Sequence, residues 1–200
     1  SYMSARWRLL RWLPWLMLGC VAAAPTASAQ SVERGLPLVV NYSPDDYGAD
    51  TQNWAAVQDL RGVLYVANNL GVLEFDGVQW RLIRIGANLA ARSLAVDAGG
   101  RIYVGAFGDF GALHPDTAGR LRFQSLAAEA RLDMATVGDV ITSGIAAGGV
   151  VFQSTKGIFV WRDGRLIVHR PETSFSAGVI VGESLFVRQR DRGLFEYTRD

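Results

Sequence analysis

The chain repeats one pattern along most of its length, and this periodicity limits its possible folds more than any other feature. Four units share one order: a β-rich run, a turn, a second run ending in small or polar residues, a glycine and a third run. The units lie at residues 56–77, 94–115, 144–164 and 178–200. Their glycines, Gly71, Gly111, Gly157 and Gly193, recur at nearly even spacing. Each unit is therefore predicted to hold several short strands joined by turns.

A period of about 40 residues with several strands in each unit is typical of a β-propeller. We predict an all-β chain, a β-propeller of four-stranded antiparallel blades. In the first unit the strands are expected near residues 54–59, 63–68, 71–76 and 79–85. The Asp76-Gly77 pair predicts a hairpin, because glycine accepts the positive φ that a tight turn requires. The best short helix candidate is Leu126 to Met134.

The predicted blades span about 54–90, 91–134 and 135–173, with an incomplete fourth at 174–200. A lead-in segment, 30–53, is expected to contribute a short strand. A closed propeller typically has four to eight blades, so about four blades, the last incomplete, predict a truncated ring. We therefore expect this chain to be the front of a longer protein. An unclosed ring leaves open sheet edges, which invite aggregation.

The segment 1–29 has the features of a secretory signal peptide. Three arginines precede an apolar run at 12–24, and Ala27-Ser28-Ala29 then gives the small-x-small pattern of a cleavage site, between Ala29 and Gln30. The alternatives are a retained N-terminal anchor and lipidation at Cys20. Cleavage would remove this only cysteine, so the exported chain could form no disulfide. The expected location is the periplasm, as part of an inner-membrane protein.

Charge argues against nucleic acid as a partner of this segment. The formal net charge is +1, and without the three arginines of the signal the balance becomes 17 basic to 19 acidic residues. A nucleic-acid interface would need a clustered basic stripe, which the sequence lacks.

No catalytic or metal-binding pattern is found, and no cofactor is expected. The two histidines, His114 and His169, are predicted to be exposed loop residues at strand ends, because no His-Glu-x-x-His or cysteine pattern accompanies them. The glycines from Gly105 to Gly111 precede a strand-like run, whereas a dinucleotide loop opens a helix. The three aspartates in 43–50 lack calcium-loop spacing and predict a solvated loop.

Two elements carry a resemblance to a known family. The run Gln58 to Val66 has the pattern Q-D-x-x-G-x-x-Y-V, and Gly71 to Trp80 has G-V-L-E-F-D-G-x-x-W. Together with Ile102 to Leu121, they resemble the periplasmic propellers of the bacterial two-component regulator propeller family. The resemblance covers about residues 36–200 and is looser in the last two units.

The resemblance implies the sensory input region of a membrane receptor. In that family a small β-sandwich, a transmembrane helix and a cytoplasmic output module follow the propeller. The output is often a histidine kinase, a diguanylate cyclase or a DNA-binding regulator. We therefore expect extracytoplasmic ligand sensing for signal transduction, with no catalysis in this segment and with a homodimer left open. The alternatives are a secreted propeller enzyme acting on polysaccharide and a non-signalling interaction scaffold.

Propellers bind ligands along the central channel or on the face that their loops form. Polar and aromatic residues near the expected strand ends are therefore the candidate contacts for a small-molecule or glycan ligand. These residues are Tyr47, Asn53, Trp54 and Asn68. Trp80 is instead predicted to pack behind the Asp76-Gly77 hairpin.

Overall fold

The structure, a computed structural model, describes residues 39–199, and the chain from Asn41 onward forms one compact unit. The predicted signal peptide and its cleavage site at Ala29 and Gln30 lie outside the described residues. Within residues 39–199 no helix is long and apolar enough to cross a membrane.

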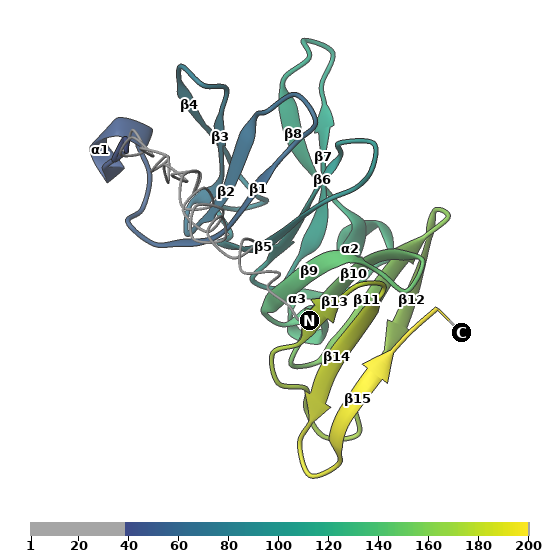
Figure 1. Cartoon of the computed structure of the whole chain (residues 1–200). Coiled ribbons are helices and arrows are strands. Elements are labelled where there is room, and N and C mark those ends of the chain that lie inside the picture. Colours follow the sequence, from purple (N-terminus) through teal and green to yellow (C-terminus); the bar gives the residue numbers. More distant parts are fainter. Residues whose placement is uncertain (1–38, 200) are drawn as a thin grey trace, which may run out of the picture. The chain divides into compact units, whose positions relative to one another are not determined.

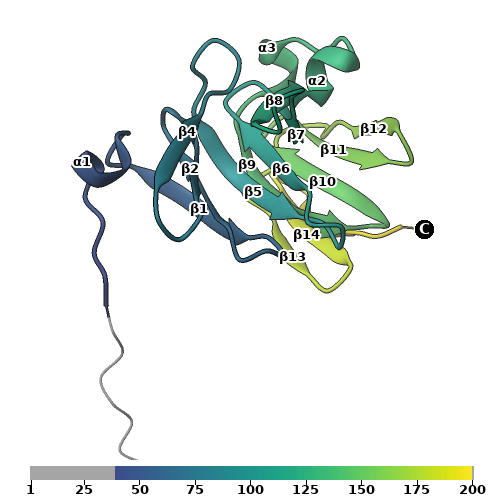
Figure 2. The same ribbon diagram turned by 90° about the horizontal axis from the view of Figure 1, so that it is seen from above.

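Four antiparallel sheets follow one another along the chain, as Figures 1 and 2 show. The first contains β1 (Asn53–Gln58), β2 (Leu64–Asn68), β3 (Gly71–Phe75) and β4 (Trp80–Ile83). The second contains β5 (Ala91–Val96), β6 (Ile102–Ala106), β7 (Phe110–Pro115) and β8 (Leu121–Ser125). The third contains β9 (Val140–Ala146), β10 (Gly149–Ser154), β11 (Gly157–Arg162) and β12 (Arg165–His169). The fourth contains three strands, β13 (Val179–Val181), β14 (Ser184–Gln189) and β15 (Gly193–Tyr197).

Within each sheet the strands pair in the order in which the chain makes them. The first strand of each sheet contacts the first strand of the next sheet: β1 contacts β5, β5 contacts β9, and β9 contacts β13. These are the inner strands of successive propeller blades, and they line the propeller axis. The described sheets do not close into a ring. The prediction of an all-β propeller with about four blades and an open ring is therefore confirmed.

Side chains that alternate along each strand form the core between neighbouring sheets. In β6, Ile102 and Val104 belong to the cluster shared with the first sheet, whereas Tyr103 belongs to the cluster shared with the third. This follows from the period of two in a strand, which sends successive side chains to opposite faces. A third cluster, around Val151 and Leu185, joins the third and fourth sheets. A middle sheet is thus apolar on both faces and polar at its turns.

The fourth sheet leaves one of its faces uncovered by the described residues. Ile180 on β13 enters the cluster shared with the third sheet, while its neighbours Val179 and Val181 point the other way and are 58% and 60% exposed. Leu194 on β15 is 72% exposed. This apolar face is where the arc of blades remains open.

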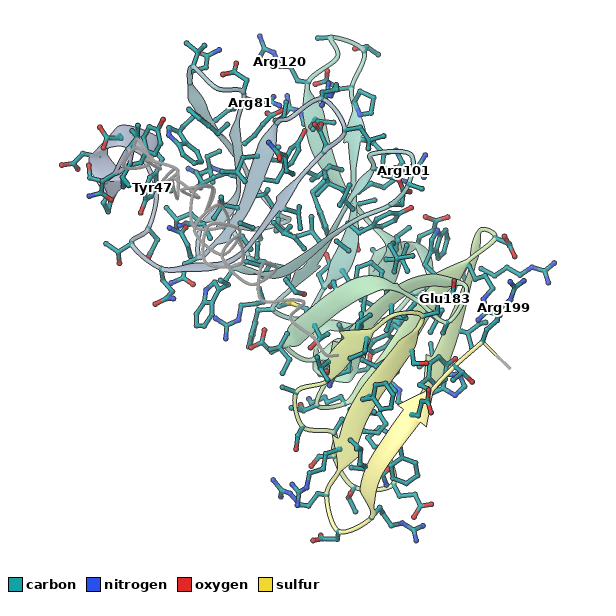
Figure 3. The ribbon with its side chains drawn as sticks, in the orientation of Figure 1. Tyr47, Arg81, Arg101, Arg120, Glu183 and Arg199 are labelled. Carbon is teal, nitrogen blue, oxygen red and sulfur yellow. The ribbon has the colours of Figure 1, made fainter. Side chains whose placement is uncertain are left out.

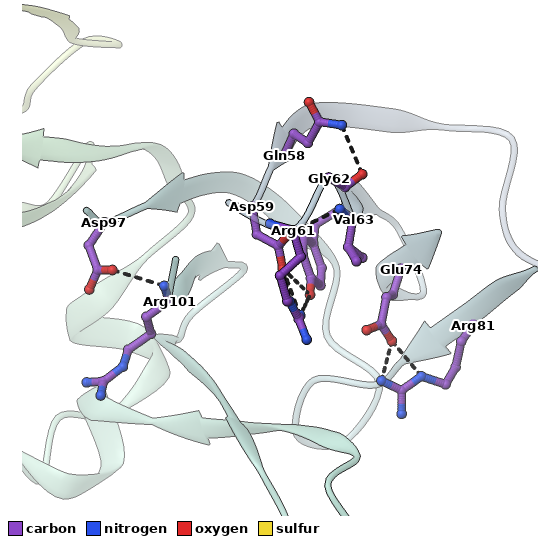
Figure 4. A network of polar contacts seen from close by, with 10 residues as sticks. Gln58, Asp59, Arg61, Gly62, Val63, Glu74, Arg81, Asp97 and Arg101 are labelled. Atoms are coloured by element: carbon purple, nitrogen blue, oxygen red, sulfur yellow. Dashed lines mark hydrogen bonds and ion pairs between the residues drawn. The ribbon is translucent and has the colours of Figure 1, made fainter. Parts of the chain in front are cut away.

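A recurring aspartate hairpin connects strands in the first two sheets. The aspartates are Asp59, Asp97 and Asp116. In each hairpin Oδ1 accepts hydrogen bonds from the backbone N–H groups two and four residues later, at 2.9–3.0 Å. A glycine at the third following position takes a positive φ, 76–87°. Figure 4 shows the Asp59 hairpin and the Asp97–Arg101 bond. The pattern D-x-x-G therefore encodes this turn locally.

The second carboxylate oxygen of each aspartate accepts from the side chain six residues later. Tyr65 donates its hydroxyl to Asp59 at 3.3 Å, and Tyr103 donates to Asp97 at 3.2 Å. Tyr65 is fully buried, and this burial, with the nearby Glu74 and Asp59 charges, raises its pKa from 10.0 to about 12. Burial raises the pKa of Tyr103 as well. Both phenols are thus held in their neutral form.

A loss of stability in alkaline solution is expected from Tyr65. Below pH 10 the phenol is neutral in the folded and unfolded chains, so its contribution is intact. Between pH 10 and about 12 only the unfolded chain loses the proton, and the free energy of unfolding falls by about 2–3 kcal/mol. The Tyr65→Phe variant should lose this part of the pH dependence in urea unfolding series, at a cost of about 1 kcal/mol at pH 7. An unchanged alkaline slope would contradict the assignment, and Tyr103→Phe should act in the same direction.

Two segments outside the sheets are helical in part. Within residues 39–52 the lead-in segment has no strand and forms the short helix α1 (Pro44–Tyr47), while residues 30–38 lie outside the described residues. The Asp46 carboxylate there accepts from the N–H and hydroxyl of Ser43 at 2.6 and 2.8 Å, and Pro44 suits the first helical turn. The solvated loop predicted there is thus partly helical. The helix expected from Leu126 is divided into α2 (Leu126–Glu129) and α3 (Met134–Val137).

Candidate functional site

The inner strands of the first three sheets each carry a β-bulge at an equivalent position. In β1 the pairs Asn53–Asn68 and Ala55–Ala67 leave Trp54 as the extra residue. The register shifts in β5 and β9 leave Arg92 and Ile141 in the same way. A bulge bends the strand and re-aims its extra side chain, and bulges are common beside functional sites. Each of these bulges lies near the start of its strand, at the end of the axis where the β2–β3, β6–β7 and β10–β11 turns also lie.

Trp54 and Arg92 contact each other across the first two sheets. The Arg92 guanidinium carbon lies 3.6 Å from the centroid of the Trp54 ring, which is a cation–π contact. The indole Nε1–H donates to Asn69 Oδ1 at 2.8 Å, and Asn69 lies in the β2–β3 turn. The ring is therefore fixed from two sides, by a charge and by a hydrogen bond.

The third sheet joins this contact through Asp139, the residue directly before β9. Arg92 Nη2 lies 3.0 Å from Asp139 Oδ2, and Arg92 Nε donates to both carboxylate oxygens at 3.2 Å. Trp54, Arg92 and Asp139, here called the axial triad, thus join three successive blades. A charge-assisted forked pair of this kind fixes orientation more strongly than a single hydrogen bond.

The axial triad is accessible to a ligand. Trp54 is 45% exposed, and the side chains of Arg92 and Asp139 are 22% and 28% exposed. Phe107, in the β6–β7 turn, is 56% exposed and forms an isolated bridge with Asp139. An aromatic ring, a cation, an anion and a second aromatic side chain therefore lie together at one end of the axis. Such a set can bind a ligand with an apolar face and polar substituents.

Beneath the triad the blades approach closely. Ser93 Oγ donates to the Val140 carbonyl at 2.9 Å and lies 2.7 Å from Ser143 Oγ. A Cβ added to Gly105 would lie 2.3 Å from Ser93 Oγ and 2.6 Å from Val140, so a glycine is needed there. The second and third blades are thus tightly joined under the exposed site.

The structure places the four predicted ligand contacts in different settings. Trp54 lies in the axial triad. Asn68 is fully buried, and its amide nitrogen donates to Asn53 Oδ1 at 2.8 Å, so these two residues bind each other beside the site. Tyr47 lies in α1, with its ring 5.8 Å from that of Trp80. Ligand contact by any of the four stays a prediction.

Trp80 packs in an aromatic cluster on the first sheet. Its ring stacks on Phe75 with centroids 4.5 Å apart, and Tyr42 approaches it edge-on at 5.4 Å. The hairpin before it is capped by Asp76, whose Oδ1 accepts from the N–H groups of Val78 and Gln79, each at 2.9 Å. Trp80 therefore packs as the sequence predicts.

Arg92 and Asp139 are not among the residues predicted from the sequence, although the repeat holds a signal for the first of them. Arg92 precedes Tyr103 by the same interval that separates Trp54 from Tyr65. Ile141 keeps this interval before Phe152 in the third unit. Aligning the units on the aromatic residue of the second strand would therefore have marked Arg92 as the equivalent of Trp54.

The remaining chemical candidates lie in strands. His114 is half-buried in β7 and not exposed in a loop as predicted, whereas His169 is exposed but ends the strand β12, with its Nε2 2.8 Å from the Tyr197 hydroxyl. The Gly105–Gly111 run forms the β6–β7 hairpin and leads into a strand, as predicted. Among the described residues no group of three or more His, Cys, Asp or Glu side chains is placed to hold a metal ion.

Comparison with known proteins gives a likeness of fold. No protein-family model matches the chain, and no curated protein sequence matches it. Among solved structures, it is similar to the extracellular domain of the putative one component system BT4673 from B. thetaiotaomicron, with 13% sequence identity and a TM-score of 0.50. The match covers 72% of this chain and 20% of that one, so the chain spans about a fifth of the neighbour's length. The chain thus shares the fold of part of an extracellular domain.

Proposed function

We propose that this chain is an extracytoplasmic, ligand-recognising propeller segment of a transmembrane signalling protein, and that it carries out no catalysis itself. The observation that carries the proposal is the axial triad, in which the equivalent bulge residues Trp54 and Arg92 contact each other and Arg92 pairs with Asp139, directly before β9, at one end of the axis. The predicted signal peptide and the extracellular nature of the fold neighbour support an extracytoplasmic location.

The triad suggests how binding could become a signal. Its three residues belong to three sheets, so a ligand that engages them changes the contacts between blades. Because Asp139 already balances the charge of Arg92, a ligand must either bridge the pair or replace one partner. Either change alters the geometry between the second and third blades. A signal results only if the ligand binds the altered geometry more tightly than the original one.

The rest of the signalling protein belongs to this proposal. We propose that a β-sandwich, a membrane helix and a cytoplasmic kinase, cyclase or DNA-binding module follow in a longer protein. The coding sequence beyond residue 200 separates this from the secreted alternatives. A membrane helix and an output module there support the sensor, whereas a stop codon soon after the last blade argues for a secreted enzyme or scaffold.

Ligand recognition at the triad is tested by thermal unfolding with a panel of small sugars, amino acids and organic acids. A ligand present at about 100 times its dissociation constant stabilises by about 2.7 kcal/mol, or roughly 5–10 °C in melting temperature for a chain of this size. We expect Trp54→Ala and Arg92→Ala to remove this shift. The control is Arg188→Ala, an exposed arginine of the fourth sheet. A shift that survives both triad variants would place the binding site elsewhere.

A further inference from the structure

A second surface feature lies away from the axis, between the outer strands of the first two blades. Two adjoining hollows of about 390 and 310 Å³ lie there and share Arg81 and Arg120 in their walls. Figure 3 labels these two arginines, on β4 and in the β7–β8 turn. The larger hollow is lined by Arg81, Leu82, Ile83, Arg84, Arg120, Leu121 and Arg122. We call this larger hollow the arginine groove.

The arginine groove has four cationic residues and no carboxylate in its own lining. Two of the cations form ion pairs with carboxylates that do not line the groove. Arg81 pairs with Glu74, and Arg122 Nε lies 3.1 Å from Asp116 Oδ2. Figure 4 shows the Arg81–Glu74 pair. The groove therefore contains cations whose counter-charges lie outside it.

The other two arginines, Arg84 and Arg120, form no ion pair with any carboxylate of the described residues. Arg84 donates to the neutral Asn88 side chain at 3.1 Å, and no hydrogen bond or ion pair within residues 39–199 involves the Arg120 guanidinium. Both residues are exposed. A surface that gathers like charges without neutralising them attracts anions, because the field of the cations adds up in the hollow between them.

The strands and turns hold these side chains in place. Asp116 Oδ1 accepts from the backbone N–H of Arg120 at 2.9 Å while its other oxygen binds the Arg122 side chain, so one aspartate fixes the Arg120 backbone and the Arg122 guanidinium. Arg81 lies opposite Glu74 in the β3–β4 pairing, which orients its side chain. The Arg81 and Arg122 side chains are thus already arranged at the groove, and little of their ordering entropy would be lost on binding.

The lining alternates charge with aliphatic surface. Leu82 and Ile83 separate Arg81 from Arg84, and Leu121 separates Arg120 from Arg122. Guanidinium groups bind carboxylates and sulfate or phosphate groups through paired N–H donors. The aliphatic side chains add an apolar surface. The C–H face of a sugar ring can pack on this surface, whereas an inorganic polyanion has no apolar face to bury there.

We propose that the arginine groove binds an acidic oligosaccharide, with its anionic groups at Arg84 and Arg120 and its sugar rings over Leu82 and Leu121. The shared chemistry is an oxyanion carried on a sugar, either a carboxylate or a sulfate ester. This site is separate from the axial triad, so its test does not depend on whether the proposed function is correct.

The test measures binding to the immobilised full chain at low salt. The probes are an oligogalacturonide, which carries carboxylates, a heparin oligosaccharide, which carries sulfates, inorganic polyphosphate and a neutral maltooligosaccharide. We expect at least one acidic oligosaccharide to bind, and the neutral one not to bind. Which of the two binds identifies the anionic group. Binding should weaken as salt rises, because the Debye length falls from about 10 Å at 0.1 M to about 3 Å at 1 M.

The double variant Arg84→Gln with Arg120→Gln should weaken binding by about tenfold to a hundredfold, the loss expected for two hydrogen-bonding groups at solvent-exposed positions. The matched control replaces Arg165 and Arg188, two exposed arginines of the third and fourth sheets, with glutamine. The control changes net charge equally and should bind as the wild type does. Equal losses in both double variants, binding of polyphosphate alone, or no binding of either acidic oligosaccharide would overturn the proposal.

Discussion

Replacing Asn68 with alanine should lower the free energy of unfolding by about 3 kcal/mol, because a fully buried amide with several partners would be lost. The Asn68 amide nitrogen donates to the Asp50 and Gln52 carbonyls at 2.6 and 3.2 Å and to Asn53 Oδ1 at 2.8 Å. Its oxygen accepts from the N–H groups of Asp50 and Leu70 at 3.2 and 3.0 Å. Alanine would leave several of these groups without a partner, at about 1–3 kcal/mol for each.

The neighbouring asparagine supplies a matched control in the same turn. Asn69 is half-buried, and its side chain makes two hydrogen bonds near the surface: Oδ1 accepts from Trp54 at 2.8 Å and Nδ2 donates to Asp50 Oδ1 at 3.3 Å. Asn69→Ala should therefore cost about 1 kcal/mol or less. Urea unfolding followed by far-UV circular dichroism measures both variants. Equal costs for Asn68→Ala and Asn69→Ala would show that the buried amide does not hold the entry to β1.

Replacing Phe152 with alanine should destabilise the fold by about 4 kcal/mol, the usual cost of removing a large buried aromatic side chain. Phe152 is fully buried on β10, and its ring stacks on Phe110 of the second sheet with centroids 4.7 Å apart. Tyr103 approaches the same ring at 6.3 Å. The substitution would leave a cavity between the second and third blades and would remove the aromatic contact that joins them.

Phe107→Ala is the control for Phe152→Ala, because Phe107 is 56% exposed in a turn of the second sheet. We expect the free energy of unfolding to fall by about 1 kcal/mol or less in that variant, because folding buries only part of the apolar surface of Phe107. Thermal unfolding of both variants, compared with wild type, gives the difference. If Phe152→Ala melts as Phe107→Ala does, the aromatic contact does not join the blades.

Local sequence signals explain why the sheets could be predicted so closely. The expected strand 63–68 is observed as Leu64–Asn68, and 71–76 is observed as Gly71–Phe75. These strands are bounded by turns whose chemistry lies within a few residues, such as the Asp59 hairpin and its Gly62. The fourth strand is shorter than expected, Trp80–Ile83 instead of 79–85, because hydrophobic patterning continues beyond the last paired residue.

The candidate site was harder to predict because it depends on contacts between blades. Arg92 and Asp139 are 47 residues apart, and no pattern in the sequence around either residue predicts that they pair. The bulge that re-aims Trp54 is a property of strand register, which a hydrophobic pattern does not reveal. The burial of Asn68 was hard to predict for the same reason. Its position at the end of β2 was predictable, but the groups that enclose its side chain come from residues 50–53.

The pairing of strands in chain order has a consequence for how the molecule assembles. Every described sheet is completed by strands that follow one another directly, through turns such as the Asp59, Asp97 and Asp116 hairpins. Contacts this close in sequence form with little loss of loop entropy and favour fast folding. A chain that emerges amino terminus first can therefore finish each blade before the next one arrives. Docking of a completed blade onto its predecessor uses contacts that are more distant in sequence, and we expect it to be the slower step.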